Sequence, residues 1–246
     1  MSYRFVRITN YYPQYLKNFY LKNPNAGSKS FSEAYKMLVD DSFETASCYT
    51  KNLNRIGVNA FDIISNDHVL QNKWIRENKL VGGIASDEII LHQLKHYNPQ
   101  VLWIDDFSFV NAEWKEKLLK KVPSIKILIG HICAPYNSEM RKKFKLFDIM
   151  FTCTPCFKIQ LENLGIKTHL LYHGFESNIL NNINVDNRFP ELDFLFSGSL
   201  YTGSGFHKSR IEYIEKILRA GIDISLYSNL ESWGKVMAKK AYTNLS

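Results

Sequence analysis

Short apolar runs alternate along most of the chain with longer segments in which apolar residues recur every three or four positions. A short, nearly continuous apolar run is typical of a strand buried in a parallel sheet, and a spacing of three or four is typical of one helix face. The predicted strands are residues 5–8, 58–64, 101–104, 125–129, 149–152 and 168–172. The predicted helices are residues 11–20, one long or two abutting helices within 30–57, and residues 87–97, 112–121, 138–146 and 156–164.

This alternation of strands and helices predicts the fold class. Strands separated by helices of roughly ten to fifteen residues are typical of βαβ units. We therefore expect an α/β protein whose N-terminal domain, residues 1–176, is a doubly wound, Rossmann-like parallel sheet. Ser30 and Glu33 have the spacing of a capping box, and Gly57 and Gly165 stand where helices should end.

The alternation of strands and helices is interrupted at residues 177–191, which are rich in asparagine and lack apolar periodicity. We interpret this stretch as a linker. Beyond it, the pattern predicts a strand at 194–196, a glycine-rich loop, a helix carrying Ile211, Ile214 and Leu218, and a strand at 224–227. One βαβ unit is less than a usual domain of ~100 residues or more, so residues 192–246 read as an incomplete second α/β domain.

Composition narrows the function classes. The hydrophobic fraction of 45% is ample for a packed core, which excludes disorder. The net charge of +7 comes from Lys and Arg scattered over predicted helix faces, so we expect no nucleic-acid partner. A mildly basic surface also suits an anionic substrate or peripheral contact with anionic membrane lipid. Four cysteines, no apolar run of ~20 residues and no leader pattern predict a cytoplasmic protein, free or peripheral to the inner face of the membrane.

Polar residues follow several predicted strands, at the sheet edge where ligands of open α/β sheets bind. Asp105 and Asp106 are candidates for a general base, or else form an Asx turn or a helix N-cap. His131 is a candidate base or phosphate ligand, or else a structural histidine. His173 and Gly174 stand just before the linker and favour a hinge or cleft-lining role.

Cys153 and Cys156 have CxxC spacing. Without a second cysteine pair or well-spaced histidines, this is a weak zinc signal, and its place after the fifth strand does not fit a thioredoxin-type motif. We expect no bound metal and no cofactor.

The glycine-rich loop of residues 198–205 runs into a helix that begins with basic residues. Free backbone amides at a helix N-terminus suit a phosphate group, although a plain surface turn is the alternative. Lys208 and Arg210 place cations beside those amides. The loop is neither a Walker loop nor a G-x-G-x-x-G fingerprint, so nothing indicates hydride or phosphoryl transfer.

Motifs along the chain resemble those of a bacterial group-1 glycosyltransferase subfamily of GT-B architecture, similar to the spore maturation-type glycosyltransferases. They are residues 12–20, 30–33 and 40–43, Asn52, Leu53 and Gly57, Asn66, Leu70, Gln71, Trp74 and Glu77, then residues 196–200 and 207–210. The resemblance implies a GT-B-like, metal-independent transferase that moves a sugar from a nucleotide-activated donor to a glycan or other hydroxyl acceptor.

The resemblance also implies roles for particular residues. Gly198, Ser199 and Arg210 would contact the donor diphosphate, where amides and cations stabilise the leaving charge. Asp105, Asp106 or His131 would lie nearest the acceptor. The related enzymes have a longer C-terminal lobe, so we expect this chain to be a fragment or shortened form. Two rivals stay open: a non-catalytic module that binds a glycan or a protein, and a small-molecule α/β enzyme such as a reductase, which would lack a dinucleotide loop after its first strand.

Overall fold

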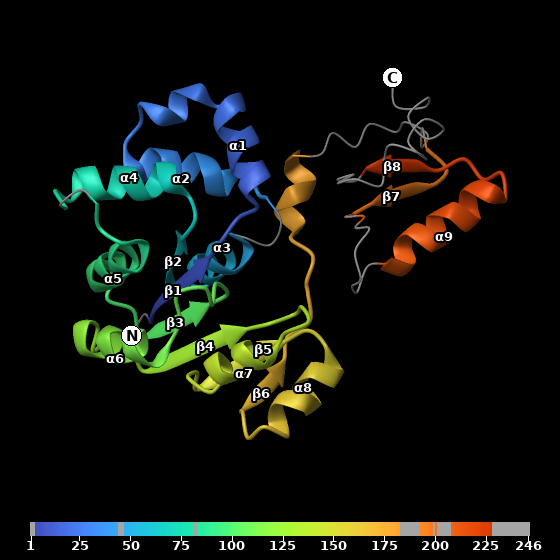
Figure 1. Cartoon of the computed structure of the whole chain (residues 1–246). Coiled ribbons are helices and arrows are strands. Elements are labelled where there is room, and N and C mark those ends of the chain that lie inside the picture. The colour runs from blue at the N-terminus through green and yellow to red at the C-terminus, as the bar shows by residue number, and fades with distance from the viewer. Residues whose placement is uncertain are drawn as a thin grey trace. The chain divides into compact units, whose positions relative to one another are not determined.

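The computed structural model describes residues 3–43, 47–80, 83–182, 192–198, 200 and 208–227 (Figure 1). The chain divides into two compact units, Met1–Ile179 and Leu180–Ser246. Among the described residues, no helix combines the length and the apolar character needed to cross a bilayer.

The first unit is built on a six-stranded sheet in the order β2-β1-β3-β4-β5-β6, and every neighbouring pair is parallel. Its strands are β1 (Arg4–Thr9), β2 (Asn59–Ile64), β3 (Val101–Ile104), β4 (Ile127–His131), β5 (Ile149–Thr152) and β6 (Thr168–Leu170). Its helices are α1 (Pro13–Lys22), α2 (Phe31–Asp40), α3 (Cys48–Arg55), α4 (His68–Glu77), α5 (Ser86–Tyr97), α6 (Ala112–Lys121), α7 (Ser138–Phe144) and α8 (Pro155–Glu162), with a 3-10 helix at Pro24–Gly27. A second 3-10 helix, Ser177–Asn182, spans the boundary between the two units. The predicted doubly wound α/β fold is confirmed.

The strand order reverses between β1 and β3. The chain steps from β1 to β2 on one side and from β3 through β6 on the other. In open α/β sheets, the crevice outside the carboxyl ends of the strands at such a switch point is the usual ligand site. The fold thus directs attention to the residues that follow β1, β3 and β4.

Alternate strand residues build two cores on opposite faces of the sheet. On one face Ile8, Leu102 and Ile104 are fully buried, together with Leu94 of α5 and Leu118 of α6. On the other face, packing is thinner. There Phe5, Ala60, Trp103 and Ile129 form a small cluster with Leu53 of α3. A third cluster joins α1, α2 and α4.

Close packing requires a glycine at position 130, next to the candidate residue His131. A Cβ placed there would lie 2.5 Å from Met150 Sδ and 3.1 Å from Phe147 Cγ, both buried. We expect Gly130→Ala to lower the free energy of unfolding by about 1–3 kcal/mol, because overpacking forces these neighbours to shift. Urea denaturation measures this loss. The control is Gly27→Ala, where the added Cβ meets nothing within 4 Å, and a midpoint unchanged in both variants would contradict the prediction.

The elements differ from the predicted ones in a few places. The sequence pattern missed α4, which Asp67 caps by accepting hydrogen bonds from the amides of Val69 and Leu70. The segment within 30–57 forms two helices, and the Ser30–Glu33 capping box is present. Strand β4 begins at Ile127, because its pairing with Val101 of β3 begins there.

The second unit contains β7 (Leu195–Ser197), α9 (Lys208–Arg219) and β8 (Ser225–Tyr227). The two strands pair in parallel, and Leu200, Ile214 and Leu226 are buried between them and the helix. These elements form the predicted βαβ unit. Ser199 and residues 201–207, which carry most of the glycine-rich loop, lie outside the described residues.

Candidate functional site

A row of polar side chains crosses the sheet face that α3 covers, near the carboxyl ends of the strands. It consists of Asp62 on β2, Arg7 on β1, Asp105 after β3 and His131 at the end of β4. The register pairs Arg7 with Asp62 and Ile104 with Gly130, so Asp105 comes opposite His131. Two of the predicted site residues, Asp105 and His131, are thereby brought together.

Asp105 is the centre of this row. Its Oδ2 accepts a hydrogen bond from Arg7 Nε at 2.6 Å and lies 2.5 Å from Arg7 Nη2. Its Oδ1 accepts from Trp103 Nε1 at 2.6 Å and lies 3.3 Å from His131 Nδ1. Burial alone would raise the pKa of Asp105, but the hydrogen bond from His131 and the charge of Arg7 hold it below the usual value. The ionised form of Asp105 is therefore favoured. Asp105 orients the imidazole and does not act as the proton acceptor.

Asp106 faces other partners. One of its oxygens accepts from Ser65 Oγ at 2.7 Å and the other from the amide of Ser108 at 3.0 Å. A carboxylate bonded to the amide two residues on is an Asx turn, the alternative considered for this residue. Through these contacts, Asp106 holds the loop after β3 in place.

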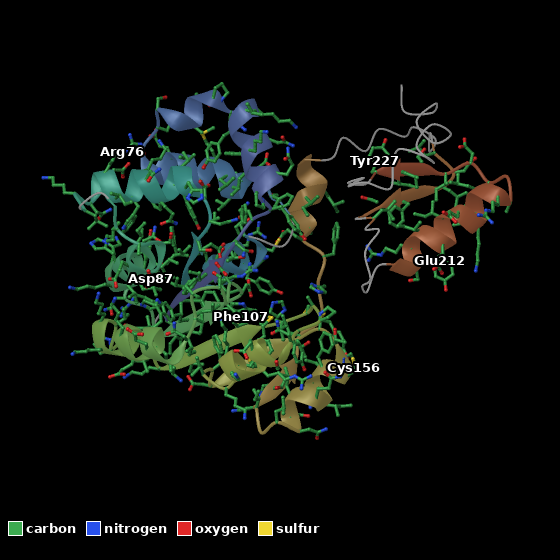
Figure 2. The ribbon with its side chains drawn as sticks, in the orientation of Figure 1. Arg76, Asp87, Phe107, Cys156, Glu212 and Tyr227 are labelled. Carbon is green, nitrogen blue, oxygen red and sulfur yellow. The ribbon has the colours of Figure 1, made fainter. Side chains whose placement is uncertain are left out.

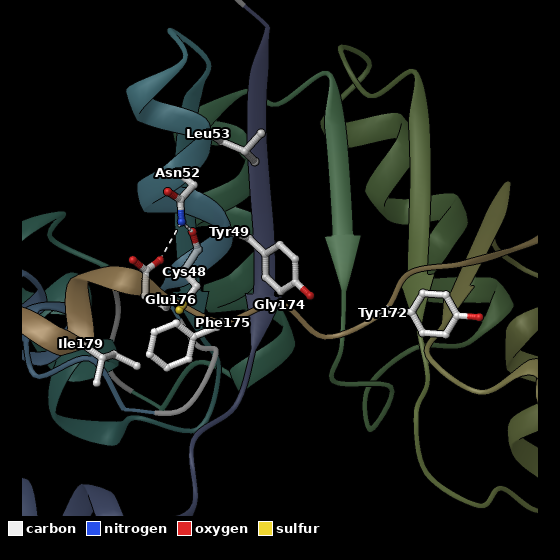
Figure 3. A pocket seen from close by; sticks show the side chains of 9 residues that line it. All are labelled: Cys48, Tyr49, Asn52, Leu53, Tyr172, Gly174, Phe175, Glu176 and Ile179. Carbon is white, nitrogen blue, oxygen red and sulfur yellow. Dashed lines mark hydrogen bonds between the residues drawn. The ribbon is translucent and has the colours of Figure 1, made fainter.

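A cavity of about 450 Å³ includes Tyr49, whose ring lies against Arg7 of the polar row. Figure 3 shows the side chains that line this cavity. It lies between α3 and the segment that follows β6, and its lining is Cys48, Tyr49, Asn52, Leu53, Tyr172, Gly174, Phe175, Glu176 and Ile179. Asn52 Nδ2 donates to Glu176 Oε2 at 2.7 Å. Tyr172 and Phe175 are 64% and 72% exposed, so these aromatic residues are open to a ligand.

Tyr49 connects the cavity to the polar row. Its ring centroid lies 5.3 Å from that of Trp103, and the Arg7 guanidinium lies 4.9 Å from the Tyr49 ring centroid. Trp103 in turn lies 5.4 Å from the His131 ring. Tyr49 and Trp103 thus form a chain of ring contacts from the cavity to the imidazole–carboxylate pair. Gly174, for which the sequence favours a hinge or cleft-lining role, lines this cavity.

His173 belongs to a different group. Its ring, Cys133 Sγ and Cys153 Sγ offer ligand atoms that all lie within 4.8 Å of one another. Sequence spacing had paired Cys153 with Cys156, but Cys156 is exposed on α8 (Figure 2). Burial, followed by the side-chain hydrogen bond with Cys153, raises the pKa of Cys133 to about 12, against the lowering effect of the Cys153 backbone amide.

In the second unit, Gly198 and Arg210 lie close together. A Cβ on Gly198 would lie 3.6 Å from Arg210 Nη1, so the guanidinium reaches the start of the glycine-rich loop. The Gly198 amide, however, donates to the carbonyl of Tyr227 at 3.0 Å. The Arg210 guanidinium thus lies beside the start of the loop, while the Gly198 amide holds β8. Ser199 lies outside the described residues.

Sequence reasoning missed Arg7, Asp62, Tyr49, Trp103 and Cys133 as members of the site. Arg7 and Asp62 carried a signal, because a charged residue inside an apolar strand must be paired when buried. The other three had no distinguishing pattern.

Comparison with models of known protein families gave no match, and a search of curated proteins gave none either. The structure itself defines the fold class, a doubly wound α/β fold. A polar row and an aromatic cavity lie at the carboxyl edge of its sheet.

Proposed function

We propose that the chain is a glycosyltransferase, or the N-terminal portion of one, that moves a sugar from a nucleotide-activated donor to a hydroxyl acceptor in surface glycan or glycoconjugate synthesis. The observation that carries the proposal is the aromatic cavity, whose Tyr49 lies against Arg7, the ion-pair partner of Asp105. Exposed rings pack against the C–H face of a sugar, and a few polar groups in a mostly apolar pocket orient it. Asn52 and Glu176 supply those polar groups.

The polar row supplies the chemistry of the acceptor side. His131 Nε2 takes the proton of the acceptor hydroxyl as its oxygen attacks the anomeric carbon of the donor. Asp105 orients the imidazole and stabilises the imidazolium, and Arg7 keeps Asp105 ionised. The bond from the anomeric carbon to the diphosphate oxygen breaks, and the negative charge leaves on the nucleoside diphosphate. Arg210 stands as the cationic ligand for that diphosphate in the second unit.

A screen of nucleotide sugars tests the proposal. The full chain is incubated with uridine, guanosine and thymidine diphosphate sugars, with and without a mixture of mono- and disaccharide acceptors. We expect at least one donor to raise the melting temperature, because a ligand that binds only the folded state stabilises it. The same donor should release nucleoside diphosphate faster with acceptor. A chain that neither binds nor turns over any donor contradicts the proposal.

A non-catalytic glycan-binding module is the second candidate, and one observation favours it. The whole lining of the cavity belongs to the first unit, so glycan binding needs no group from the second. Binding of saccharides in the screen, without binding or turnover of any nucleotide sugar, would select this candidate over the transferase.

A further inference from the structure

Three metal-ligating side chains converge at the edge of the sheet. Cys133 follows β4, Cys153 follows β5, and His173 follows β6. Cys133 and Cys153 are neighbours because the register pairs His131 with Phe151 two residues earlier. The segment after β6 then adds the imidazole, and the three ligand atoms lie within 4.8 Å of one another. Only these residues, among those that the structure describes, make such a group.

The ligand types favour zinc. Two thiolates and an imidazole are soft to borderline ligands that Zn²⁺ binds in tetrahedral geometry, and three protein ligands leave a fourth position for water or a substrate oxygen. Both thiols are half-buried and His173 is exposed, so the site is sheltered and yet open to an entering ion.

Two groups contact the sulfur of Cys133 and hold it in place. The backbone amide of Cys153 donates to Cys133 Sγ at 3.0 Å, and His131 Nε2 lies 3.2 Å from the same sulfur. These contacts keep the sulfur beside the other two ligand atoms of the group.

We propose that Cys133, Cys153 and His173 bind one Zn²⁺ ion per chain. The proposal does not rest on sugar transfer, although its ligand Cys133 Sγ lies 3.2 Å from His131 Nε2, the base proposed for that reaction. It differs from our expectation of a metal-free protein. It also replaces the CxxC pair as the thiol site, because Cys156 is not part of the group.

Zinc titration of the reduced, metal-free full chain tests the proposal, with a chromophoric chelator as competitor. We expect one ion per chain, and thiolate-to-metal charge-transfer absorption when Co²⁺ replaces Zn²⁺. Cys133→Ser, Cys153→Ser and His173→Ala should each weaken zinc binding by more than about 100-fold, since even outer partners of metal ligands carry about 10–100-fold in affinity. Cys156→Ser and Cys48→Ser are the matched controls and should bind zinc as the wild type does.

His173→Ala guards against a folding artefact, because its side chain is exposed. Its melting temperature without zinc should equal that of the wild type, whereas zinc should raise only the wild-type value. Three results would overturn the proposal: no stoichiometric zinc binding by the reduced chain, loss of binding in Cys156→Ser, or full binding in His173→Ala.

Discussion

Replacing Arg7 with methionine is expected to lower the free energy of unfolding by about 3–5 kcal/mol, because breaking a buried ion pair leaves a carboxylate buried without its partner. Arg7 has 6% of its side chain exposed and contacts Asp105 through two nitrogens. It also lies beside Asp62 in the strand register. In Arg7→Met, Asp105 and Asp62 both lose the neighbouring positive charge, while methionine keeps most of the apolar stem of the arginine side chain.

Chemical denaturation of the two proteins measures this effect. The matched control is Arg4→Met on the same strand, where the Nε donates only one exposed hydrogen bond, to the carbonyl of Asn98, and the expected cost is about 1 kcal/mol. If Arg7→Met costs no more than Arg4→Met, Arg7 is not the charge that holds the polar row together.

The second large effect concerns the pH dependence of stability. Asp62 is fully buried, and its Oδ2 accepts from Thr50 Oγ1 at 2.6 Å. No partner for its Oδ1 is found among the described residues. Burial raises the pKa of Asp62 to about 7, against the lowering effect of Arg7. The folded state therefore holds this proton more tightly than the unfolded chain does.

The contribution of Asp62 to stability is full below the unfolded pKa of about 4 and is lost as the pH rises to about 7, at about 1.4 kcal/mol per unit of pKa difference. We expect Asp62→Asn to flatten this decline and to be more stable than the wild type at pH 8. Melting temperatures between pH 4 and pH 8 measure it, with Asp87→Asn as control. A wild-type decline that persists in Asp62→Asn would contradict the assignment.

Much of the fold could be predicted from the sequence because buried parallel strands have short, nearly continuous apolar sequences. Strand β3 and helix α6 have the predicted bounds, since Asn98-Pro99 precedes the strand and Asn111 caps the helix. Helix α4 was missed because its buried face includes Gln71 and Lys73, polar residues that obscure the apolar period. The Lys73 ammonium donates to the carbonyl of Gly27, a contact that only the tertiary structure creates.

The candidate site was predictable only in part. Asp105 and His131 were found because polar residues after parallel strands meet at one edge of the sheet. Their partners depend on strand order and register, which the sequence does not reveal. Cys133 joins Cys153 because β4 and β5 are neighbours, whereas chain spacing favoured Cys156. Likewise, the pairing of β7 with β8 occupies the Gly198 amide that a glycine-rich loop would otherwise offer to a phosphate.

The central claim is that the His131–Asp105 pair serves the acceptor side of sugar transfer. Acceptor-dependent release of nucleoside diphosphate by His131→Ala tests it most directly, on the reduced chain with a chelator present. We expect kcat to fall by about 10²–10⁴-fold, the usual contribution of a general base. His169→Ala, which removes an exposed histidine from β6, should leave kcat unchanged. An unaltered kcat in His131→Ala would contradict the claim.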